Sequence, residues 1–192
     1  MASPSNKKIL IITVTIAIVV IMLLWIVLAY NNVVGKEQDV NSASSLIKNR
    51  YTTKVNILGQ LLPQVDAYKV YESSLITNLT MLQTQWQQAL NQGADDETLI
   101  NISSQIDTNF ILVLSTWTNY PQLEADELVS QYMAEVVDLE EQLSYARSVY
   151  NDAVRNYNTS IRSFPTMLFA GMWGFEERPY WGSELPDDSL GL

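Results

Sequence analysis

The chain has 192 residues, enough for one domain with an appendage; 47% of them are hydrophobic and only 17% are charged. Cysteine and histidine are both absent, which excludes disulfide frameworks, thiol catalysis, the common zinc sites and any imidazole base. From residue 30 onward, 9 basic residues stand against 21 acidic ones, a net charge of −12. Nucleic acid is therefore not an expected partner.

The first predicted element is a membrane span. Residues 1–8 form a short polar tail, and no charge occurs between Ile9 and Tyr30. A helix over 9–30 would be about 33 Å long, enough to cross a bilayer core, and Trp25 and Tyr30 near its end suit the membrane interface. A cleaved signal peptide is the alternative, but this apolar run exceeds the usual length of such a segment. We expect an uncleaved single-pass anchor.

The orientation of the anchor depends on few charges. Lys7 and Lys8 precede the span, and Lys36 is the only basic residue in the fifteen positions after it. Basic residues are favoured on the cytoplasmic side of a membrane. We therefore expect the span to cross the cell (inner) membrane, with the short tail in the cytoplasm and the body, residues 31–192, on the extracytoplasmic side. The opposite topology is an open alternative.

Four apolar stripes with helical spacing follow the span, and we predict helices over 31–68, 72–92, 97–118 and 124–163. The first can be continuous with the membrane helix, and Pro63 either kinks it or marks its last turns. Gly93 is expected as a C-cap, whereas Asp95 and Asp96 offer an N-cap. The fourth stripe runs through Leu128, Tyr132, Val136, Leu139, Leu143, Ala146, Tyr150, Ala153, Tyr157 and Ile161.

The predicted fold class is all-α, with an N-terminal transmembrane helix that continues into an elongated antiparallel up-down-up-down four-helix bundle over 31–163, packed as in a coiled coil. The two short helices can cover only the distal half of the long pair. We therefore expect an apolar seam near the membrane, covered by a second copy or a partner.

Several motifs resemble the LemA family of membrane-anchored prokaryotic proteins. They lie mainly in the second half and comprise Tyr120, Pro121, Arg147, Tyr150, Asn151, Tyr157, Asn158, Phe164 and Pro165, followed by Gly174-Phe175 and by Tyr180 and Trp181. The chain departs from the family between residues 50 and 65. There the family usually has two basic residues and then Asp-Leu-Ile-Pro-Asn-Leu-Val, whereas this chain has Asn49-Arg50 and Lys54-Val55-Asn56-Ile57-Leu58. The resemblance implies a membrane anchor and a helical bundle, but no defined activity.

An acidic cluster, Glu135, Asp138, Glu140 and Glu141, is the main candidate for metal or acid–base chemistry. A ferritin-like di-iron site needs Glu-x-x-His pairs, and this chain has no histidine. We interpret the cluster as a solvated helix face; a glycosidase-like carboxylate pair or a loosely held Ca²⁺ or Mg²⁺ ion are the alternatives.

The last predicted helix carries tyrosines, asparagines and arginines at regular spacing. Tyr150 and Tyr157 are expected to fill the seam against the first helix, with Asn151 and Asn158 satisfying buried polar groups. Three arginines, Arg147, Arg155 and Arg162, are expected to form ion pairs, with Asp152 as one acceptor. The sequence shows no nucleophile–base pair and no glycine-rich phosphate loop, so we expect no catalytic residue, cofactor or metal.

Residues 164–192 form an aromatic and then acidic C-terminal tail. Its aromatic and methionine side chains either cap the open end of the bundle or form an interface with membrane or protein; we favour the interface, made by Phe164, Met167, Phe169, Met172, Trp173, Phe175, Tyr180 and Trp181.

Taken together, these features favour a non-enzymatic, membrane-anchored scaffold or assembly protein. Its expected partners are membrane lipid, further copies of itself and a membrane protein. An envelope sensor or signalling adaptor is the alternative, followed by a hydrolase that uses carboxylates alone.

Overall fold

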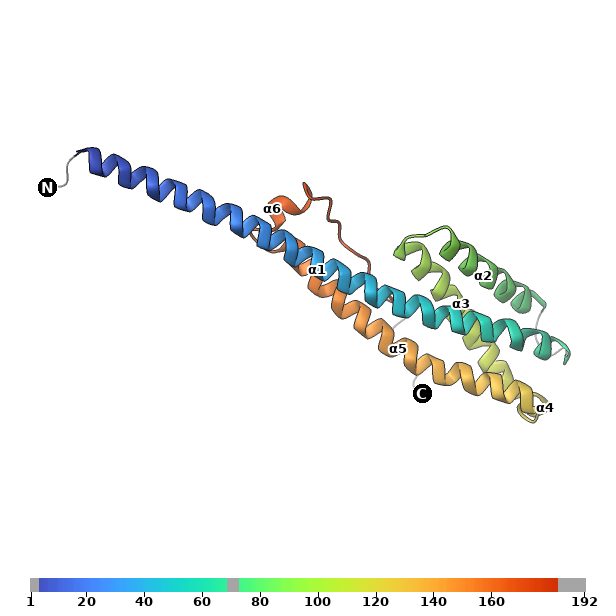
Figure 1. Cartoon of the computed structure of the whole chain (residues 1–192). Coiled ribbons are helices and arrows are strands. Elements are labelled where there is room, and N and C mark those ends of the chain that lie inside the picture. The colour runs from blue at the N-terminus through green and yellow to red at the C-terminus, as the bar shows by residue number, and fades with distance from the viewer. Residues whose placement is uncertain (1–3, 69–72, 183–192) are drawn as a thin grey trace. The chain divides into compact units, whose positions relative to one another are not determined.

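The computed structural model describes residues 4–68 and 73–182, in which six helices and no strand occur (Figure 1). The all-α prediction is confirmed. The chain divides into two compact units: unit 1 comprises Met1–Asp39 and Asn156–Glu177, and unit 2 comprises Val40–Arg155 and Arg178–Leu192. The up-down-up-down bundle stays a prediction, and so we describe each unit by itself.

Helix α1 runs from Pro4 to Asp66, so the apolar run and the first body helix belong to one element, as the sequence suggested. Pro63 lies in its last turn, where the missing N–H removes only one of the final hydrogen bonds. Tyr68, predicted to end this helix, lies just beyond it, and its hydroxyl donates to the carboxylate of Asp126.

Helices α2 (Ser73–Asn91) and α3 (Asp96–Asn119) are joined by a tight turn. Gly93 has a φ of 67°, and the N–H of Ala94 donates to the carbonyl of Ala89 at 2.9 Å, a C-cap of the predicted kind. Asp95 is the N-cap of α3 and accepts a hydrogen bond from the N–H of Thr98. Residue 72, the predicted start of the second helix, lies outside the described residues.

The fourth predicted helix is divided in the structure. Pro121–Glu124 forms the short helix α4, and α5 runs from Glu127 to Arg162. The predicted start at residue 124 is wrong because the carboxylate of Asp126 accepts hydrogen bonds from the N–H groups of Leu128 and Val129 and so starts a new helix. Leu128, expected in the apolar stripe, is 42% exposed, whereas Val129 is buried. A short helix that the sequence did not predict, α6, spans Met167–Ala170.

The core of unit 2 is built from the apolar stripes of α1, α2, α3 and α5. Its largest fully buried side chains include Ile47, Tyr51, Leu61, Leu82, Trp86, Leu99, Ile106, Met133 and Tyr150. α1 and α2 meet at Tyr51 and Trp86, whose ring centroids are 5.3 Å apart, and the Trp86 indole N–H donates to the Thr52 hydroxyl. Among the described residues of this core, two side chains carry charges that apolar surroundings cannot solvate: Lys54, which is 0% exposed, and Asp96, which is 6% exposed.

Candidate functional site

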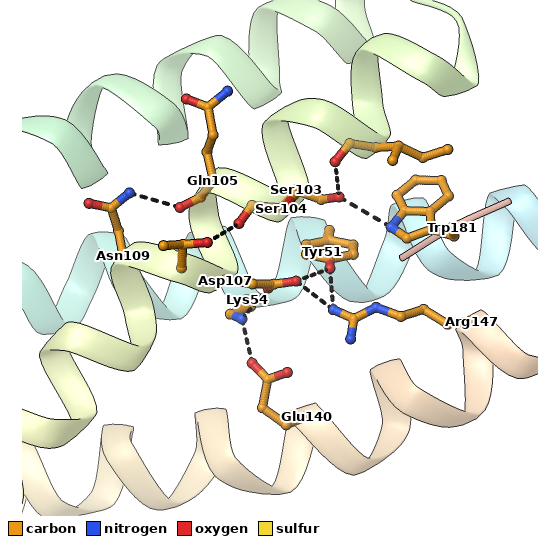
Figure 2. Close-up of polar contacts among 12 residues, drawn as sticks. Tyr51, Lys54, Ser103, Ser104, Gln105, Asp107, Asn109, Glu140, Arg147 and Trp181 are labelled. Atoms are coloured by element: carbon orange, nitrogen blue, oxygen red, sulfur yellow. Dashed lines mark hydrogen bonds and ion pairs between the residues drawn. The ribbon is translucent and has the colours of Figure 1, made fainter. Parts of the chain in front are cut away.

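Lys54 of α1 is held by two carboxylates from other helices. Its Nζ donates to Asp107 Oδ1 of α3 at 2.6 Å and also to Glu140 Oε1 of α5. The same Nζ lies 4.8 Å from the centroid of the Phe110 ring, within the range of a cation–π contact. Figure 2 shows the three charged groups pointing toward one another. A buried ammonium group needs such partners, because a charge that is removed from water and left unpaired is strongly destabilising.

Arg147 of α5 approaches the same Asp107 carboxylate from the other side (Figure 2). Its Nη2 donates to Asp107 Oδ2 at 2.6 Å and to the hydroxyl of Tyr51, and that hydroxyl donates to Asp107 Oδ2. Burial, together with the neighbouring Asp107 carboxylate, raises the pKa of Tyr51 well above its ordinary value. Tyr51 is therefore a neutral hydrogen-bond donor in this cluster.

A cavity of about 120 Å³ lies beside this cluster. Its walls are formed by residues of α3, by Tyr51 and Arg147, and by Trp181, which follows α6 in the chain. The Nε of Arg147 is buried and has no hydrogen-bond partner among the described residues. The cavity therefore lies against two aromatic side chains and the Arg147 side chain, whose Nε–H is itself buried.

A second polar cluster surrounds Asp96, which is buried at the start of α3. Its carboxylate accepts a hydrogen bond from Ser44 at 2.9 Å and lies 3.0 Å from Lys48 Nζ and 3.6 Å from Arg178 Nη1. Of the two aspartates considered as N-caps, only Asp95 has that role. Asp96 is instead a core acceptor.

Tyr150 of α5 reaches this second cluster from the opposite helix. Its hydroxyl lies 3.1 Å from the carbonyl of Pro179 and 3.3 Å from Asp96 Oδ2. Burial, followed by the charge of Asp96, raises the pKa of Tyr150.

Trp181 is 3% exposed and belongs to the core of unit 2. Its ring stacks on Tyr51 with centroids 5.9 Å apart and meets Tyr150 edge-on at 5.6 Å. Its indole N–H donates to the hydroxyl of Ser103 at 3.1 Å (Figure 2), and its backbone exchanges two hydrogen bonds with the Asn151 amide. The structure therefore places Trp181 in the core of unit 2, apart from the exposed residues of the predicted interface.

In unit 1, three predicted interface residues pack on α1. The ring of Phe169 lies 6.3 Å from Trp25, and Trp173 and Phe175 lie 5.4 and 5.7 Å from Tyr30. Phe164, Met167 and Met172 of the predicted set are exposed, as is Ile9 on α1. In unit 2, the ring of Tyr180 is also exposed.

The remaining family motif residues have structural positions. Tyr120 and Pro121 begin α4, with the proline in its first turn. Tyr157 and Asn158 are buried in unit 1, and Pro165 follows Phe164 through a cis peptide bond. The predicted ion pairs are also present: Arg147 with Asp107, Arg155 with Asp152, and Arg162 with Glu177 at 3.6 Å.

The acidic face of α5 is only partly as predicted. Glu135, Asp138 and Glu141 are exposed, but Glu140 is half-buried and pairs with Lys54. A helix surface can be inferred from sequence, yet the buried lysine opposite Glu140 belongs to another helix. In the described ranges 4–68 and 73–182, no group of three or more acidic side chains is placed to hold a metal ion.

Lys54 and Asp107 are the site residues that the sequence analysis missed. A signal for Lys54 was present, because it lies three residues after Tyr51 and four before Leu58, on the apolar stripe of α1. A lysine on such a face is either exposed at its edge or paired in the core. Chemically, the resulting network holds α1, α3 and α5 together through neutralised charges, and its carboxylates and cations already satisfy one another.

Comparison with known proteins places this fold in a family. A model of the LemA family matches residues 43–188. Protein LemA of Metamycoplasma hominis is 23% identical over 140 residues, which are 73% of this chain and 63% of that relative. The chain thus spans somewhat less than two thirds of the curated relative that it matches. Because the family model covers most of the chain, including the residues of both polar clusters, the protein belongs to the LemA family.

Proposed function

We propose that this LemA-family protein is a membrane-anchored, non-enzymatic scaffold that holds unit 2 at a membrane for assembly with copies of itself or with other proteins. The observation that carries the proposal is the composition of α1. One helix supplies both an exposed apolar run before residue 30 and core residues of unit 2 such as Ile47, Tyr51 and Lys54.

Burial supports the anchor. By length and composition, α1 contains a stretch able to cross a membrane. Across residues 8–30 every side chain is exposed except Trp25, Ile26 and Ala29, which are half-buried. The hydroxyls of Thr13 and Thr15 donate to carbonyls four residues earlier, as polar groups facing lipid must. A core helix of a water-soluble protein would instead bury this run.

The charged network supports a structural role over a catalytic one. Lys54 and Arg147 are each paired with carboxylates, and Tyr51 is held neutral. A catalytic group usually has a lone pair or a proton available for reaction and a pKa near the working pH. Turnover by the purified full-length chain that is abolished by Glu141→Gln, an exposed carboxylate outside the network, would contradict the proposal.

Self-association is the proposed mode of assembly, although its surface differs from our expectation. The membrane-proximal parts of α1 and α5 bury their apolar side chains Val33, Tyr157 and Ile161. The ring centroids of Phe175 and Tyr157 are 6.5 Å apart. No uncovered apolar seam is found there among the described residues. We place the contact instead on the exposed Val137 and Tyr145 of α5, beside a groove lined by Leu46, Arg50, Glu141, Gln142 and Tyr145.

The test uses full-length protein in nanodiscs, sized by mass photometry, because membrane confinement raises the effective concentration of like chains. We expect a multimer that Val137→Ser with Tyr145→Ser weakens. The matched control is Met81→Ser with Ile111→Ser, which also removes exposed apolar side chains from unit 2. A monomer at every loading would contradict self-association, and a specific co-purified membrane protein would then identify an adaptor.

The cavity beside Arg147 favours one second candidate, an envelope sensor. Its volume of about 120 Å³ suits a small polar molecule, and Asn101 and Ser104 in its wall carry polar side chains that could bind one. Thermal-shift screening with small carboxylates and amides tests this function. A ligand that stabilises the wild type but not Ser104→Trp, which would fill the cavity, would support it.

We further propose that the membrane is the cell (inner) membrane, with the short N-terminal tail in the cytoplasm and unit 2 outside. Lys7 and Lys8 before the run support this orientation.

A further inference from the structure

The segment Phe164–Phe175 of unit 1 has two apolar faces. Its inner face consists of Phe169, Ala170, Trp173 and Phe175, all buried or half-buried. The three aromatic rings of this face pack against Trp25 or Tyr30 of α1. Its outer face carries Phe164 (78% exposed), Met167, Leu168 and Met172 (82% exposed). A segment that only capped the helices of unit 1 would present polar side chains on its outer face.

Charge is distributed in this segment as in a membrane-dipping loop. No charged residue occurs from Phe164 to Phe175. Charged residues flank the segment on both sides, and Arg162 Nε lies 3.6 Å from Glu177 Oε1, with both side chains exposed. An exposed ion pair therefore joins the two ends of the segment, and the uncharged residues lie between them.

The contact with Trp25 fixes the level of this loop relative to the apolar run. Trp25 lies five residues before Tyr30, the end of the uncharged run, which corresponds to about 7.5 Å along a helix. Phe169 packs against Trp25 itself. If the run crosses a bilayer, the short helix α6 lies inside the membrane edge, and its outer face meets acyl chains.

Most backbone N–H groups of the segment are hydrogen-bonded within it, as that location favours. Lipid offers no partner to a free N–H group. Within this segment, N–H groups donate to carbonyls of residues 163–171, and the donors are those of Met167, Leu168, Phe169, Ala170, Trp173, Gly174 and Phe175.

We propose that Phe164–Phe175 is a second membrane-contacting element, a lipid-embedded loop that wedges into the outer edge of the bilayer beside the anchor. The occupant of its outer face is lipid. The inference rests on the anchoring part of the proposed function and does not require self-association.

The absence of native cysteine makes each introduced thiol unique, and this allows a direct test. Leu168→Cys and Met172→Cys report the outer face, Leu24→Cys reports the anchor, and Met81→Cys, an exposed position of unit 2 outside the proposed contact between copies, is the matched aqueous control. Each full-length variant carries an environment-sensitive fluorophore in nanodiscs of phosphatidylcholine and phosphatidylglycerol, with or without nitroxide-labelled lipid.

We expect quenching by the labelled lipid at positions 168 and 172 to be comparable with that at position 24 and several-fold greater than at position 81. Quenching at 24 but not at 168 and 172 overturns the loop and leaves the anchor intact. The loop is also overturned if the fluorophores at 168 and 172 report an apolar environment that the labelled lipid does not quench and that becomes more apolar as the number of chains per disc rises. A second copy then covers the face. Absence of quenching at position 24 overturns the anchor and the loop together.

Discussion

The Nζ of Lys54 lies 2.6 Å from Oδ1 of Asp107, although 53 residues separate them in the chain. The ammonium group is fully buried, and the same carboxylate also receives Arg147 and the hydroxyl of Tyr51. Three helices therefore meet at one aspartate. The arrangement makes the packing of unit 2 depend on matched charges rather than on apolar contact alone.

Replacement of Lys54 by Met is expected to destabilise the protein strongly. The apolar chain keeps most of the volume, but Asp107 and Glu140 lose their shared cation. Removal of one partner from a buried ion pair typically costs about 3–5 kcal/mol. Urea unfolding of the full-length chain in detergent, followed by circular dichroism, measures this change.

The matched control is Arg155→Met, which removes an exposed cation paired with Asp152, and it should change the unfolding midpoint little. The double change Lys54→Met with Glu140→Gln should recover part of the loss, because Asp107 still pairs with Arg147 and no unpaired charge remains. Equal midpoints for wild type and Lys54→Met would show that the network does not stabilise unit 2.

Trp181→Ala is expected to cost about 3–5 kcal/mol, as is usual for a buried aromatic side chain. The change removes both the stacking on Tyr51 and the hydrogen bond to Ser103. Ser103→Ala isolates the hydrogen bond and should cost about 1 kcal/mol. The neighbouring Tyr180→Ala, at an exposed ring, is the control. If both neighbours had equal effects, Trp181 would not belong to the core.

Stability should fall on the alkaline side. Tyrosine in an unfolded chain ionises near pH 10, whereas burial and nearby carboxylates raise the pKa of Tyr51 and Tyr150 in the fold. Above about pH 10 the unfolded state therefore releases these protons first, and the free energy of unfolding decreases as the pH rises.

Melting temperatures between pH 8 and pH 11 test this dependence. Tyr51→Phe with Tyr150→Phe lowers the stability at pH 8 but should make the alkaline decline shallower than in the wild type. Tyr145→Phe, at an exposed ring, is the control. A decline of unchanged slope in the double variant would assign the alkaline sensitivity to other groups.

The variant Met81→Cys, with an exposed thiol in unit 2, also tests the proposed topology. In intact spheroplasts, a membrane-impermeant maleimide should label this thiol, because we place unit 2 outside the cytoplasm. Protease added to the same cells should degrade the body. Labelling and cleavage that occur only after lysis would reverse the orientation.

The sequence by itself determined the four long helical stripes, the apolar run, the Gly93 cap, an N-cap at Asp95 or Asp96, and the family resemblance, because each depends on residues a few positions apart. It also suggested that arginines of the last helix would be paired. These features follow from helical periodicity and from backbone groups that must be satisfied at helix ends.

Only the tertiary structure decided which groups meet. Lys54 lies within the stretch where the chain departs from its family, and its two carboxylates come from 53 and 86 residues away. The aromatic tail was one candidate surface in the sequence, but folding buries Trp181 in unit 2 and leaves Met172 exposed in unit 1. Periodicity shows which face of a helix a side chain occupies; the partner of a buried charge or ring is chosen by the approach of distant segments, which local sequence does not encode.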